Sequence, residues 1–485
     1  MNSLYHSKII DSLFYHARTT PDKIAIIIAN EDRYITYREL KEYVLGVSSY
    51  LKSLDLGQNI IVSCARKDLS WIALYLACNM CGITIGVIDP KVSRSNLDAI
   101  LLQTKSNILY GFDLDGYTSL KFKLHPARSI EIECGQKING ECVAEVMFTS
   151  GTTGRPKGAC LSYYNINASV NNINHHIKIS DSDVELIGLP ICHSFGLGRL
   201  RCVIDKGATA VLLPNFSNVK LFFLCIEKYK VTGFGIVPAA WLYIQHFSGQ
   251  YISRFSGQIK YVEIGSAALP IEEKLKLKEL LPDTAIIMHY GLTEASRSFF
   301  LDFNDGSCDL NSVGHPSQFI MPMIMNDNND ICKDNELGEI CVKGDTVIKS
   351  YLDENDNKNC FINGYFRTGD CGYKVGNTYY LEGRFKELIN VGGKKVNPAE
   401  VEAAIIKLGI KECACVGFKD PHGILGEIPK VFMVKGDEDI SIKQITEALS
   451  KTLEPYKIPR EFVWINSIPK TESGKIKRTE LKNKT

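Results

Sequence analysis

The sequence lacks several features that would set it apart from ordinary globular proteins. No stretch of eighteen apolar residues is free of charged ones, which excludes a transmembrane helix. Neither sign of charge dominates, because 56 lysines and arginines stand against 55 aspartates and glutamates, so nucleic acid is not an expected partner. No internal repeat is visible, and a content of 45% hydrophobic and 23% charged residues excludes a disordered or fibrous chain.

Cysteine is present but is not arranged as a metal or disulfide framework. The chain has 16 cysteines, and its C-x-x-C pair, Cys78 and Cys81, stands in an apolar run with no second pair at zinc spacing. We therefore expect buried helical cysteines at this point. The first residues, MNSLYHSKIIDSLF, have neither an uninterrupted apolar core nor a small-residue cleavage site, so they do not resemble a signal peptide. The expected location is the reducing cytoplasm.

Strand-like apolar runs alternate with helix-like segments over most of the 485 residues, which predicts α/β layers with largely parallel sheets. Helices are expected at 37–53, 69–81, 219–228 and 272–280, and strands at 24–28, 59–63, 84–88, 210–213, 233–237 and 285–288. Short runs around 337–346 and 377–381 indicate antiparallel β structure. Beyond Arg384 the pattern predicts a compact α+β part, with helices at 398–407 and 441–452 and strands at 413–418 and 430–434.

The string TSGTTGRPKG at 149–158 is the most informative stretch of the chain, and it follows an apolar strand at 143–148. Its glycines let backbone N–H groups turn toward an anion, its hydroxyls add donors, and Lys157 supplies a positive charge. A polyphosphate requires these three features. The string is not a Walker A loop, in which the lysine directly follows the second glycine and a helix begins at once.

This string resembles the signature of the adenylate-forming superfamily, which includes acyl-CoA synthetases, firefly luciferase and the adenylation domains of nonribosomal peptide synthetases. Further segments resemble motifs of the superfamily in the same order: YGLTE at 290–294, GEICVKG at 338–344, YFRTGD at 365–370, GRFKELI to PAEVE at 383–402 and PKTESGK at 469–475. The match runs from about residue 34 to residue 478. In character the chain is closest to acyl- or aryl-acid ligases.

The resemblance implies an α/β fold with a large N-terminal domain, made of layered α/β subdomains and a small β-barrel-like part, and a small mobile α+β C-terminal domain. We place the N-terminal domain at 1–383, a hinge at 384–387 with Lys386 as its pivot, and the C-terminal domain at 388–485. Pivoting between two conformations would let the C-terminal domain serve adenylation first and thioester formation second.

The resemblance also implies a role for each matched residue. The leaving phosphates are expected to bind the loop residues Thr149, Ser150, Gly151, Thr152, Thr153, Gly154 and Lys157. The catalytic residues would be Thr293, Glu294 and Lys475, with Glu294 as a Mg²⁺ ligand and Lys475 between the substrate carboxylate and the α-phosphate. The nucleoside is expected to bind Gly265, Ser266, Ala267, Tyr290, Gly291, Asp370 and Arg384. The implied cofactors are ATP and Mg²⁺.

The segment PICHSFGLG at 190–198 resembles the P-x-x-H-x-x-G segment of acyl- and aryl-CoA ligases. Amino-acid-activating relatives usually carry an aspartate after the aromatic residue, where this chain has Gly196. Without that carboxylate a substrate ammonium would be buried without a partner, which disfavours an amino acid. Arg199, Arg201 and Arg297 are interpreted as exposed or paired rather than as ligands of a second anionic group. The expected pocket residues are His193, Gly196, Val237, Gly265, Gly291 and His315.

The leading hypothesis is an ATP-dependent carboxylate–thiol ligase that forms acyl-AMP and then a thioester. Its substrate would be a small carboxylic acid, and its acceptor either coenzyme A or the phosphopantetheine of an acyl or peptidyl carrier protein. The alternative is an amino-acid-activating enzyme that loads a carrier protein. A P-loop phosphotransferase would release ADP instead of AMP. A catalytically inactive adenylate-binding module would have lost Lys157, Glu294, Asp370 or Lys475, and all four are present.

Overall fold

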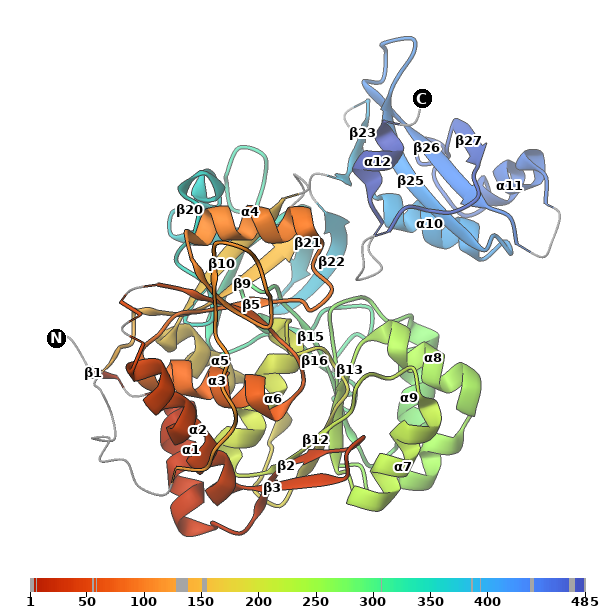
Figure 1. Cartoon of the computed structure of the whole chain (residues 1–485). Helices are drawn as coiled ribbons and strands as arrows, with labels where there is room; N and C mark the ends of the chain where they lie inside the picture. Colours follow the sequence, from red (N-terminus) through yellow and green to blue (C-terminus); the bar gives the residue numbers. More distant parts are fainter. Residues whose placement is uncertain are drawn as a thin grey trace. The chain divides into compact units, whose positions relative to one another are not determined.

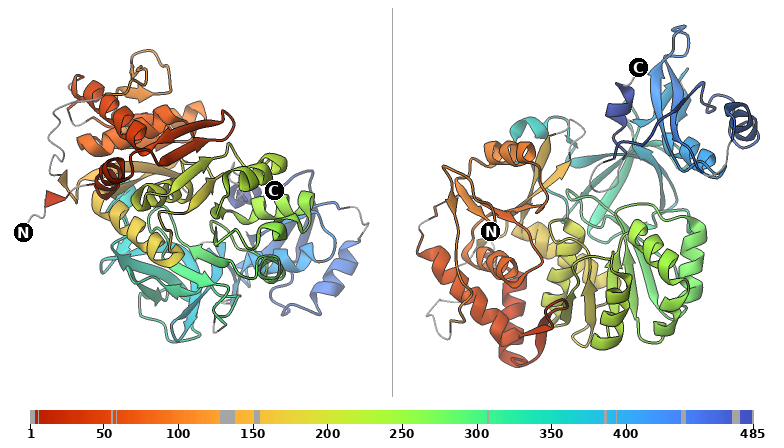
Figure 2. Two further views of the ribbon diagram at one scale, coloured as in Figure 1. Left: turned by 90° about the horizontal axis from the view of Figure 1, so that it is seen from below. Right: turned by 45° about the vertical axis from the view of Figure 1, so that its right-hand side comes forward.

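The structure is a computed structural model of the chain, shown in Figures 1 and 2. It describes residues 4–5, 7–54, 56–57, 59–127, 138–150, 155–306, 308–384, 387–392, 394–436, 440–470 and 476–483. The chain divides into two compact units: one is Met1–Pro322, Cys341–Arg367 and Gly376–Tyr379, the other Met323–Ile340, Thr368–Val375 and Tyr380–Thr485. The limits predicted from the sequence, 1–383 and 388–485 with a hinge between them, stay a prediction.

A nine-stranded sheet forms the larger part of the first unit, in the order β17-β16-β15-β14-β13-β11-β12-β2-β3. The strands from β15 to β2 in this order are parallel to their neighbours, whereas β16, β17 and β3 are antiparallel additions at the edges. The bounds are β2 (Ile24–Ile28), β3 (Arg33–Thr36), β11 (Val184–Ile187), β12 (Thr209–Leu212), β13 (Gly233–Ile236), β14 (Tyr261–Ile264), β15 (Ala285–Tyr290), β16 (Phe299–Asp302) and β17 (His315–Pro316).

Helices cover this sheet because parallel strands need crossover connections, which are usually helical. Figure 1 shows α7 (Val219–Tyr229), α8 (Pro238–Ser248) and α9 (Ile271–Leu280) together beside the sheet. Their apolar side chains and those of the strands share one hydrophobic cluster, in which Phe222, Phe234 and Trp241 are almost fully buried. Each such burial contributes roughly 1.5–3 kcal/mol relative to exposure. The helices α5 (Tyr163–Ile177) and α6 (Ser194–Lys206) pack against each other.

A six-stranded sheet, in the order β10-β9-β5-β4-β6-β7, completes the α/β part of the first unit. Its strands are β4 (Ile61–Cys64), β5 (Ile85–Ile88), β6 (Ile108–Tyr110), β7 (Thr118–Ser119), β9 (Val143–Ser150) and β10 (Pro156–Ser162). The helices of this part and of the N-terminal segment are α1 (Lys8–Thr19), α2 (Tyr37–Lys52), α3 (Leu69–Cys81) and α4 (Arg94–Thr104). A short pair joins β1 (Leu4–Tyr5) to β8 (Ile138–Asn139).

Helix α3 shows how local sequence sets these elements. The Asp68 side chain caps its first turn by accepting from the Trp71 backbone N–H, and Gly82 ends it at a φ of 73°, which glycine adopts without strain. The helix is apolar all round and therefore buried. Both cysteines lie in this helix, with Cys78 buried and Cys81 half-buried, so the prediction of buried helical cysteines is confirmed in full only for Cys78.

The predicted antiparallel region is a five-stranded sheet, in the order β18-β19-β21-β20 with β22 also paired to β21. Its strands are β18 (Ile320–Met325), β19 (Gly338–Gly344), β20 (Phe361–Ile362), β21 (Tyr365–Val375) and β22 (Thr378–Arg384). The boundary between the two units runs through β18, β19, β21 and β22. Two short 3₁₀ helices, η1 (Tyr251–Phe255) and η2 (Glu354–Asn357), belong to the first unit.

The end of the chain has the compact α+β pattern that the sequence predicts. Its three-stranded sheet has the order β25-β26-β27, and β23 pairs with β24. Ile389, Val401, Val431 and Ile445 are buried in one hydrophobic cluster there. The elements are β23 (Ile389–Val391), β24 (Lys394–Val396), α10 (Pro398–Ile406), β25 (Glu412–Lys419), β26 (Glu427–Val434), α11 (Ile442–Leu449), β27 (Glu461–Trp464) and α12 (Arg478–Lys482).

Candidate active site

The candidate site is built on loops that follow parallel strands of the nine-stranded sheet. Val237 follows β13, Gly265 follows β14 and Gly291 follows β15, while the segment before α6 follows β11. The carboxyl ends of parallel strands meet at one edge of a sheet, where α/β proteins bind their ligands. The structure thus brings five of the predicted pocket residues to this edge: His193, Gly196, Val237, Gly265 and Gly291.

Three glycines at this edge leave no room for a side chain. A Cβ atom on Gly265 would lie 2.2 Å from the His289 ring, and one on Gly291 would lie 2.5 Å from the backbone nitrogen of Arg297. A Cβ atom on Gly196 would lie 2.2 Å from the carbonyl oxygen of Pro190. Because backbone atoms cannot move aside as a flexible side chain can, glycine is required at Gly196 and Gly291 for the loops to approach this closely.

Glu294, the predicted magnesium ligand, connects the two sheets of the first unit. It follows β15 and is 8% exposed. Its Oε1 accepts a hydrogen bond from the Thr149 hydroxyl of β9 at 3.2 Å and one from the Tyr351 hydroxyl at 2.8 Å. Burial, and next to it the Glu294 carboxylate, raise the pKa of Tyr351 well above its usual range, so its hydroxyl keeps the proton that it donates. Thr149, predicted to bind the leaving phosphates, and Glu294, predicted to bind Mg²⁺, are therefore in contact.

The phosphate loop connects two antiparallel strands. Thr149 and Ser150 end β9 and Lys157 lies in β10, where the register places Lys157 directly opposite Thr149. This strand–loop–strand arrangement agrees with the prediction that the string is not a Walker A loop, which leads into a helix. The predicted loop residues Gly151, Thr152, Thr153 and Gly154 lie outside the described residues.

Acidic residues of the 351–357 segment pair with the cations of the phosphate loop. Lys157 Nζ lies 3.3 Å from Asp356 Oδ1, and Arg155 donates to Asp353 at 3.0 Å and to Asp356 at 2.9 Å. The Lys157 ammonium also lies 5.5 Å from the centroid of the Tyr351 ring. Sequence reasoning missed Tyr351, Asp353 and Asp356, because a short acidic stretch carries no signal for a partner nearly two hundred residues away in the sequence.

The other predicted nucleotide residues of the first unit lie on neighbouring loops. Tyr290 ends β15 half-buried, with its ring 5.6 Å from that of Phe299, and Thr293 is half-buried in the loop before Glu294. Ser266 and Ala267 are exposed, and Ser266 has a φ of 74°, a left-handed conformation that turns the backbone sharply after β14.

In the second unit, the predicted ribose residues Asp370 and Arg384 form an ion pair. Arg384 Nε lies 2.8 Å from Asp370 Oδ1, and the Asp370 backbone N–H donates to the Thr368 hydroxyl at 3.0 Å. Gly369, within β21, has a φ of 72°, which glycine adopts without strain, and its N–H donates to Glu339 at 3.0 Å. The predicted Lys386 and Lys475 lie outside the described residues.

A buried ion network lies beneath the first-unit loops. Arg199 donates to Glu185 at 2.5 Å and to Glu263 at 3.0 Å, and Arg297 Nε lies 3.2 Å from Glu263 Oε1. His289 Nδ1 lies 2.8 Å from the same oxygen. Burial alone would raise the pKa of Glu263, but Arg297, His289 and Arg199 hold it well below its usual range. Burial lowers the pKa of His289, so its ring is neutral at pH 7.

This network also holds the first turn of α6. Arg297 donates to the carbonyl oxygens of Ser194 at 3.1 Å and Phe195 at 3.2 Å, and its guanidinium lies 5.0 Å from the centroid of the Phe195 ring. Arg201 is likewise buried, and it donates to Glu145 and, at 2.8 Å, to the Tyr75 hydroxyl. The interpretation of these arginines as paired is correct, although they are buried rather than exposed.

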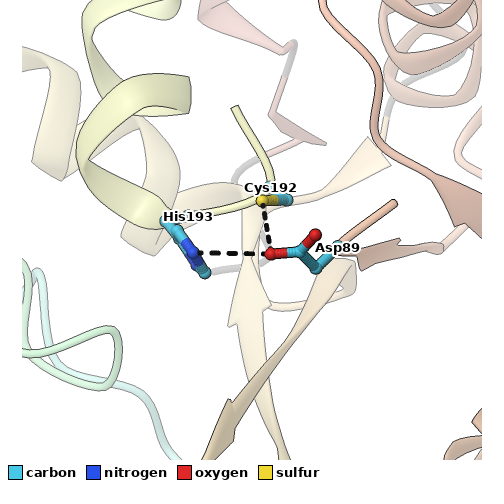
Figure 3. Close-up of side chains that lie close together, drawn as sticks. All are labelled: Asp89, Cys192 and His193. Carbon is cyan, nitrogen blue, oxygen red and sulfur yellow. Dashed lines mark hydrogen bonds and ion pairs between the residues drawn. The ribbon is translucent and has the colours of Figure 1, made fainter. Parts of the chain in front are cut away.

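The two predicted pocket histidines have different surroundings. His193 is the N-cap residue of α6, and its Nε2 lies 3.9 Å from Asp89 Oδ2 (Figure 3). His315 starts β17, with Nδ1 3.0 Å from the Asn377 carbonyl oxygen and Nε2 3.4 Å from Cys308 Sγ.

Among the described residues, no helix is both long and apolar enough to cross a membrane.

Comparisons with known proteins match nearly the whole chain. The AMP-binding enzyme family model matches residues 13–352, and the AMP-binding enzyme C-terminal domain model matches residues 400–475. A 2-succinylbenzoate–CoA ligase of Bacillus licheniformis is 28% identical over 96% of this chain and 98% of its own length. The long-chain-fatty-acid–CoA ligase FadD13 of Mycobacterium tuberculosis is 29% identical over 96% of each chain.

Solved structures give the same result for the fold. The o-succinylbenzoate CoA synthetase (MenE) of Bacillus subtilis, in complex with the acyl-adenylate intermediate OSB-AMP, has a TM-score of 0.87 at 27% identity and covers 98% of both chains. The same enzyme with ATP and magnesium ion has a TM-score of 0.85 at 27% identity, covering 97% of this chain and 99% of that one.

The predicted α/β fold class with a small C-terminal domain, the use of ATP and Mg²⁺, and the class of ATP-dependent acid–thiol ligase are confirmed. Because the first family model alone spans more than half of the sequence, this chain belongs to the AMP-binding enzyme family.

Proposed function

We propose that this enzyme activates a monocarboxylic acid with an apolar acyl or aryl group as its acyl-AMP, and then transfers the acyl group to the thiol of coenzyme A. The relatives named above are CoA ligases, which favours coenzyme A over a carrier protein as the acceptor. The substrates in their names differ, since 2-succinylbenzoate is a dicarboxylic acid and a long-chain fatty acid has one carboxylate. The choice between these classes depends on the charges at the sheet edge.

The observation that carries the proposal is the pairing of the buried guanidinium groups of Arg199 and Arg297 beside the edge that we assign to the acyl group. At Gly196, a Cβ atom would lie 2.2 Å from the Pro190 carbonyl oxygen, so an aspartate for a substrate ammonium does not fit there. Arg199 and Arg297 are 1% and 2% exposed and are already neutralised by Glu185 and Glu263. Neither guanidinium is available to a second substrate carboxylate, because recruiting it would leave a buried glutamate unpaired.

The nucleotide would bind the residues predicted from the motifs. Lys157 and the loop before it would neutralise the leaving phosphates, once these displace the Asp356 carboxylate from the ammonium. Glu294 and Thr149 offer hard oxygen atoms of the kind that Mg²⁺ prefers, and they lie in hydrogen-bond contact. When bound there, Mg²⁺ would supply positive charge to the phosphate oxygens. Asp370 would accept from the ribose hydroxyls, with Arg384 orienting it.

The chemical step requires alignment of the two reactants more than covalent catalysis by the protein. A substrate carboxylate oxygen attacks the α-phosphorus of ATP, and pyrophosphate leaves in line. Thr293 would donate to the α-phosphate, Tyr290 would stack on adenine, and Lys475 would bridge the carboxylate and the α-phosphate. In the second step the sulfur of coenzyme A attacks the acyl carbon, AMP leaves, and the thiol proton is lost to solvent.

ATP–pyrophosphate exchange against a panel of acids tests the proposal. The panel contains a fatty acid, an aryl monocarboxylic acid, 2-succinylbenzoate and the common amino acids, and the nucleotide product is identified as AMP or ADP. We expect exchange with a fatty or aryl monocarboxylate and AMP as the product. Exchange with 2-succinylbenzoate alone would overturn the substrate class, and exchange with amino acids alone would overturn the Gly196 argument. Formation of a thioester on a carrier protein but not on coenzyme A would overturn the acceptor.

A further inference from the structure

We propose that Asp89, Cys192 and His193 form a binding site for a borderline-soft divalent cation of the Zn²⁺ type, separate from the magnesium site at Glu294. Asp89 directly follows β5 of the six-stranded sheet, and Cys192 and His193 precede α6, which follows β11 of the nine-stranded sheet. The three side chains converge from these two sheets, and one carboxylate oxygen of Asp89 faces both the cysteine sulfur and the imidazole (Figure 3).

The distances suit a tetrahedral cation. Asp89 Oδ2 lies 3.6 Å from Cys192 Sγ and 3.9 Å from His193 Nε2, and the three ligand atoms all lie within 4.8 Å of one another. With metal–sulfur bonds of about 2.3 Å and metal–oxygen and metal–nitrogen bonds of about 2.0–2.2 Å, neighbouring ligand atoms of a tetrahedral zinc site are about 3.4–3.6 Å apart. The oxygen and sulfur already have this spacing, and the imidazole needs a shift of a few tenths of an ångström relative to the oxygen.

Backbone hydrogen bonds orient the Asp89 carboxylate toward the proposed cation site. Asp89 Oδ1 accepts a hydrogen bond from the Lys91 backbone N–H at 2.8 Å, and the Val92 N–H donates to the Asp89 carbonyl oxygen at 3.0 Å. This turn holds the carboxylate so that Oδ2 points to the cysteine and the histidine. Hydrogen bonds that orient a ligating carboxylate are typical of metal sites, where they raise the affinity.

The set of ligands selects the cation. Thiolate, imidazole and carboxylate together suit Zn²⁺ or Co²⁺, whereas Mg²⁺ prefers oxygen ligands throughout. The side chains of His193 and Asp89 are 55% and 35% exposed, so a cation can enter from solvent, whereas Cys192 is 7% exposed. Binding releases the cysteine proton to solvent and leaves a fourth position for water. The thiolate and the carboxylate then balance the two positive charges.

The consequence for activity rests on the proposed function. His193 belongs to the segment that we assign to the acyl pocket, and a bound cation would fix its imidazole against Asp89. We therefore expect Zn²⁺ to raise the KM for the acid at saturating ATP and Mg²⁺. This kinetic effect is secondary, because the site itself is tested by spectroscopy, which does not depend on catalysis.

The test is a titration of the full-length protein with Co²⁺ in excess Mg²⁺. We expect one Co²⁺ per chain, with thiolate-to-cobalt absorption in the near ultraviolet, strong visible bands of tetrahedral Co²⁺, and loss of both on addition of Zn²⁺. Cys192→Ser should remove the thiolate band. Asp89→Asn and His193→Gln should lower the affinity for Co²⁺ by more than the roughly 10- to 100-fold that is typical when a residue hydrogen-bonded to a metal ligand is lost. Far-UV circular dichroism confirms that each variant is folded.

Cys308 supplies a matched control. Its sulfur lies 3.4 Å from His315 Nε2 and 3.5 Å from Asp305 Oδ2, so it too has a histidine and an aspartate nearby. The ligand atoms of these three residues are not all close enough together to bind one cation. Cys308→Ser and Glu294→Gln should leave the cobalt spectrum unchanged. The proposal is overturned if the wild-type protein shows no thiolate–cobalt band, if Cys192→Ser keeps that band, or if Cys308→Ser removes it. If the wild-type protein shows the expected cobalt spectrum but adenylates no carboxylic acid, only the proposed function is contradicted.

Discussion

Replacing Glu263 by glutamine tests how the buried ion network holds the loops at the edge of the nine-stranded sheet. The Glu263 side chain is fully buried and contacts Arg199, Arg297 and His289 at 3.0, 3.2 and 2.8 Å. Glu185 and Glu263 carry two negative charges, Arg199 and Arg297 carry two positive charges, and His289 is neutral. The variant would therefore leave one positive charge buried without compensation.

The magnitude follows from this imbalance. Removal of one partner of a buried ion pair costs about 3–5 kcal/mol, because the remaining charge stays desolvated. Glu141→Gln is the matched control, because it breaks an ion pair on the surface: the side chains of Glu141 and Lys349 are 52% and 69% exposed. This variant should lower the free energy of unfolding by no more than about 1 kcal/mol. The assay is equilibrium unfolding in urea at pH 7, followed by fluorescence and by far-UV circular dichroism, with the midpoint and slope compared for all three proteins.

The pH dependence gives a second criterion. Its partners hold the pKa of Glu263 below its ordinary value of 4.5, so the stabilisation is complete above that pH and is lost as the pH falls toward the lowered pKa. The stability difference between wild type and Glu263→Gln should therefore shrink on acidification below about pH 4.5. A cost at pH 7 equal to that of Glu141→Gln, or a difference that widens toward low pH, would refute the reasoning.

Three further predictions concern the reaction. Glu294→Gln should lower the rate of Mg²⁺-dependent ATP–pyrophosphate exchange by about 10²–10³-fold. Tyr351→Phe removes only one hydrogen bond to Glu294 and should lower this rate less than about tenfold. Equal losses in the two variants would contradict the assignment of Glu294 as a magnesium ligand. Lys475→Ala should reduce adenylation by several orders of magnitude and largely spare thioester formation from preformed acyl-AMP, and an equal loss in both steps would count against its role. Lys386→Pro should keep adenylation and slow thioester formation in stopped-flow assays; if both half-reactions slow equally, the two-conformation hypothesis is wrong.

Local sequence determines helix α3 and the character of the motif loops of this protein. The sequence predicts α3 with its observed bounds, because the Asp68 cap, the apolar run and Gly82 are signals within one helix length. It also predicts that the 149–158 string is no Walker loop, because the spacing of its lysine and glycines is a local property. Strand β12 begins and ends one residue earlier than predicted, because hydrogen bonding to its neighbours decides where a strand ends.

Tertiary structure alone decides which charges meet. The pairing of Glu263 with Arg199 and Arg297, of Asp356 with Lys157, and of Asp89 with His193 joins residues far apart in the sequence. No periodicity or spacing records such contacts, because they arise only when elements far apart in the sequence pack against one another. The sequence therefore determined which chemical groups this enzyme has, and packing decided which of them are already neutralised and which remain available to a ligand.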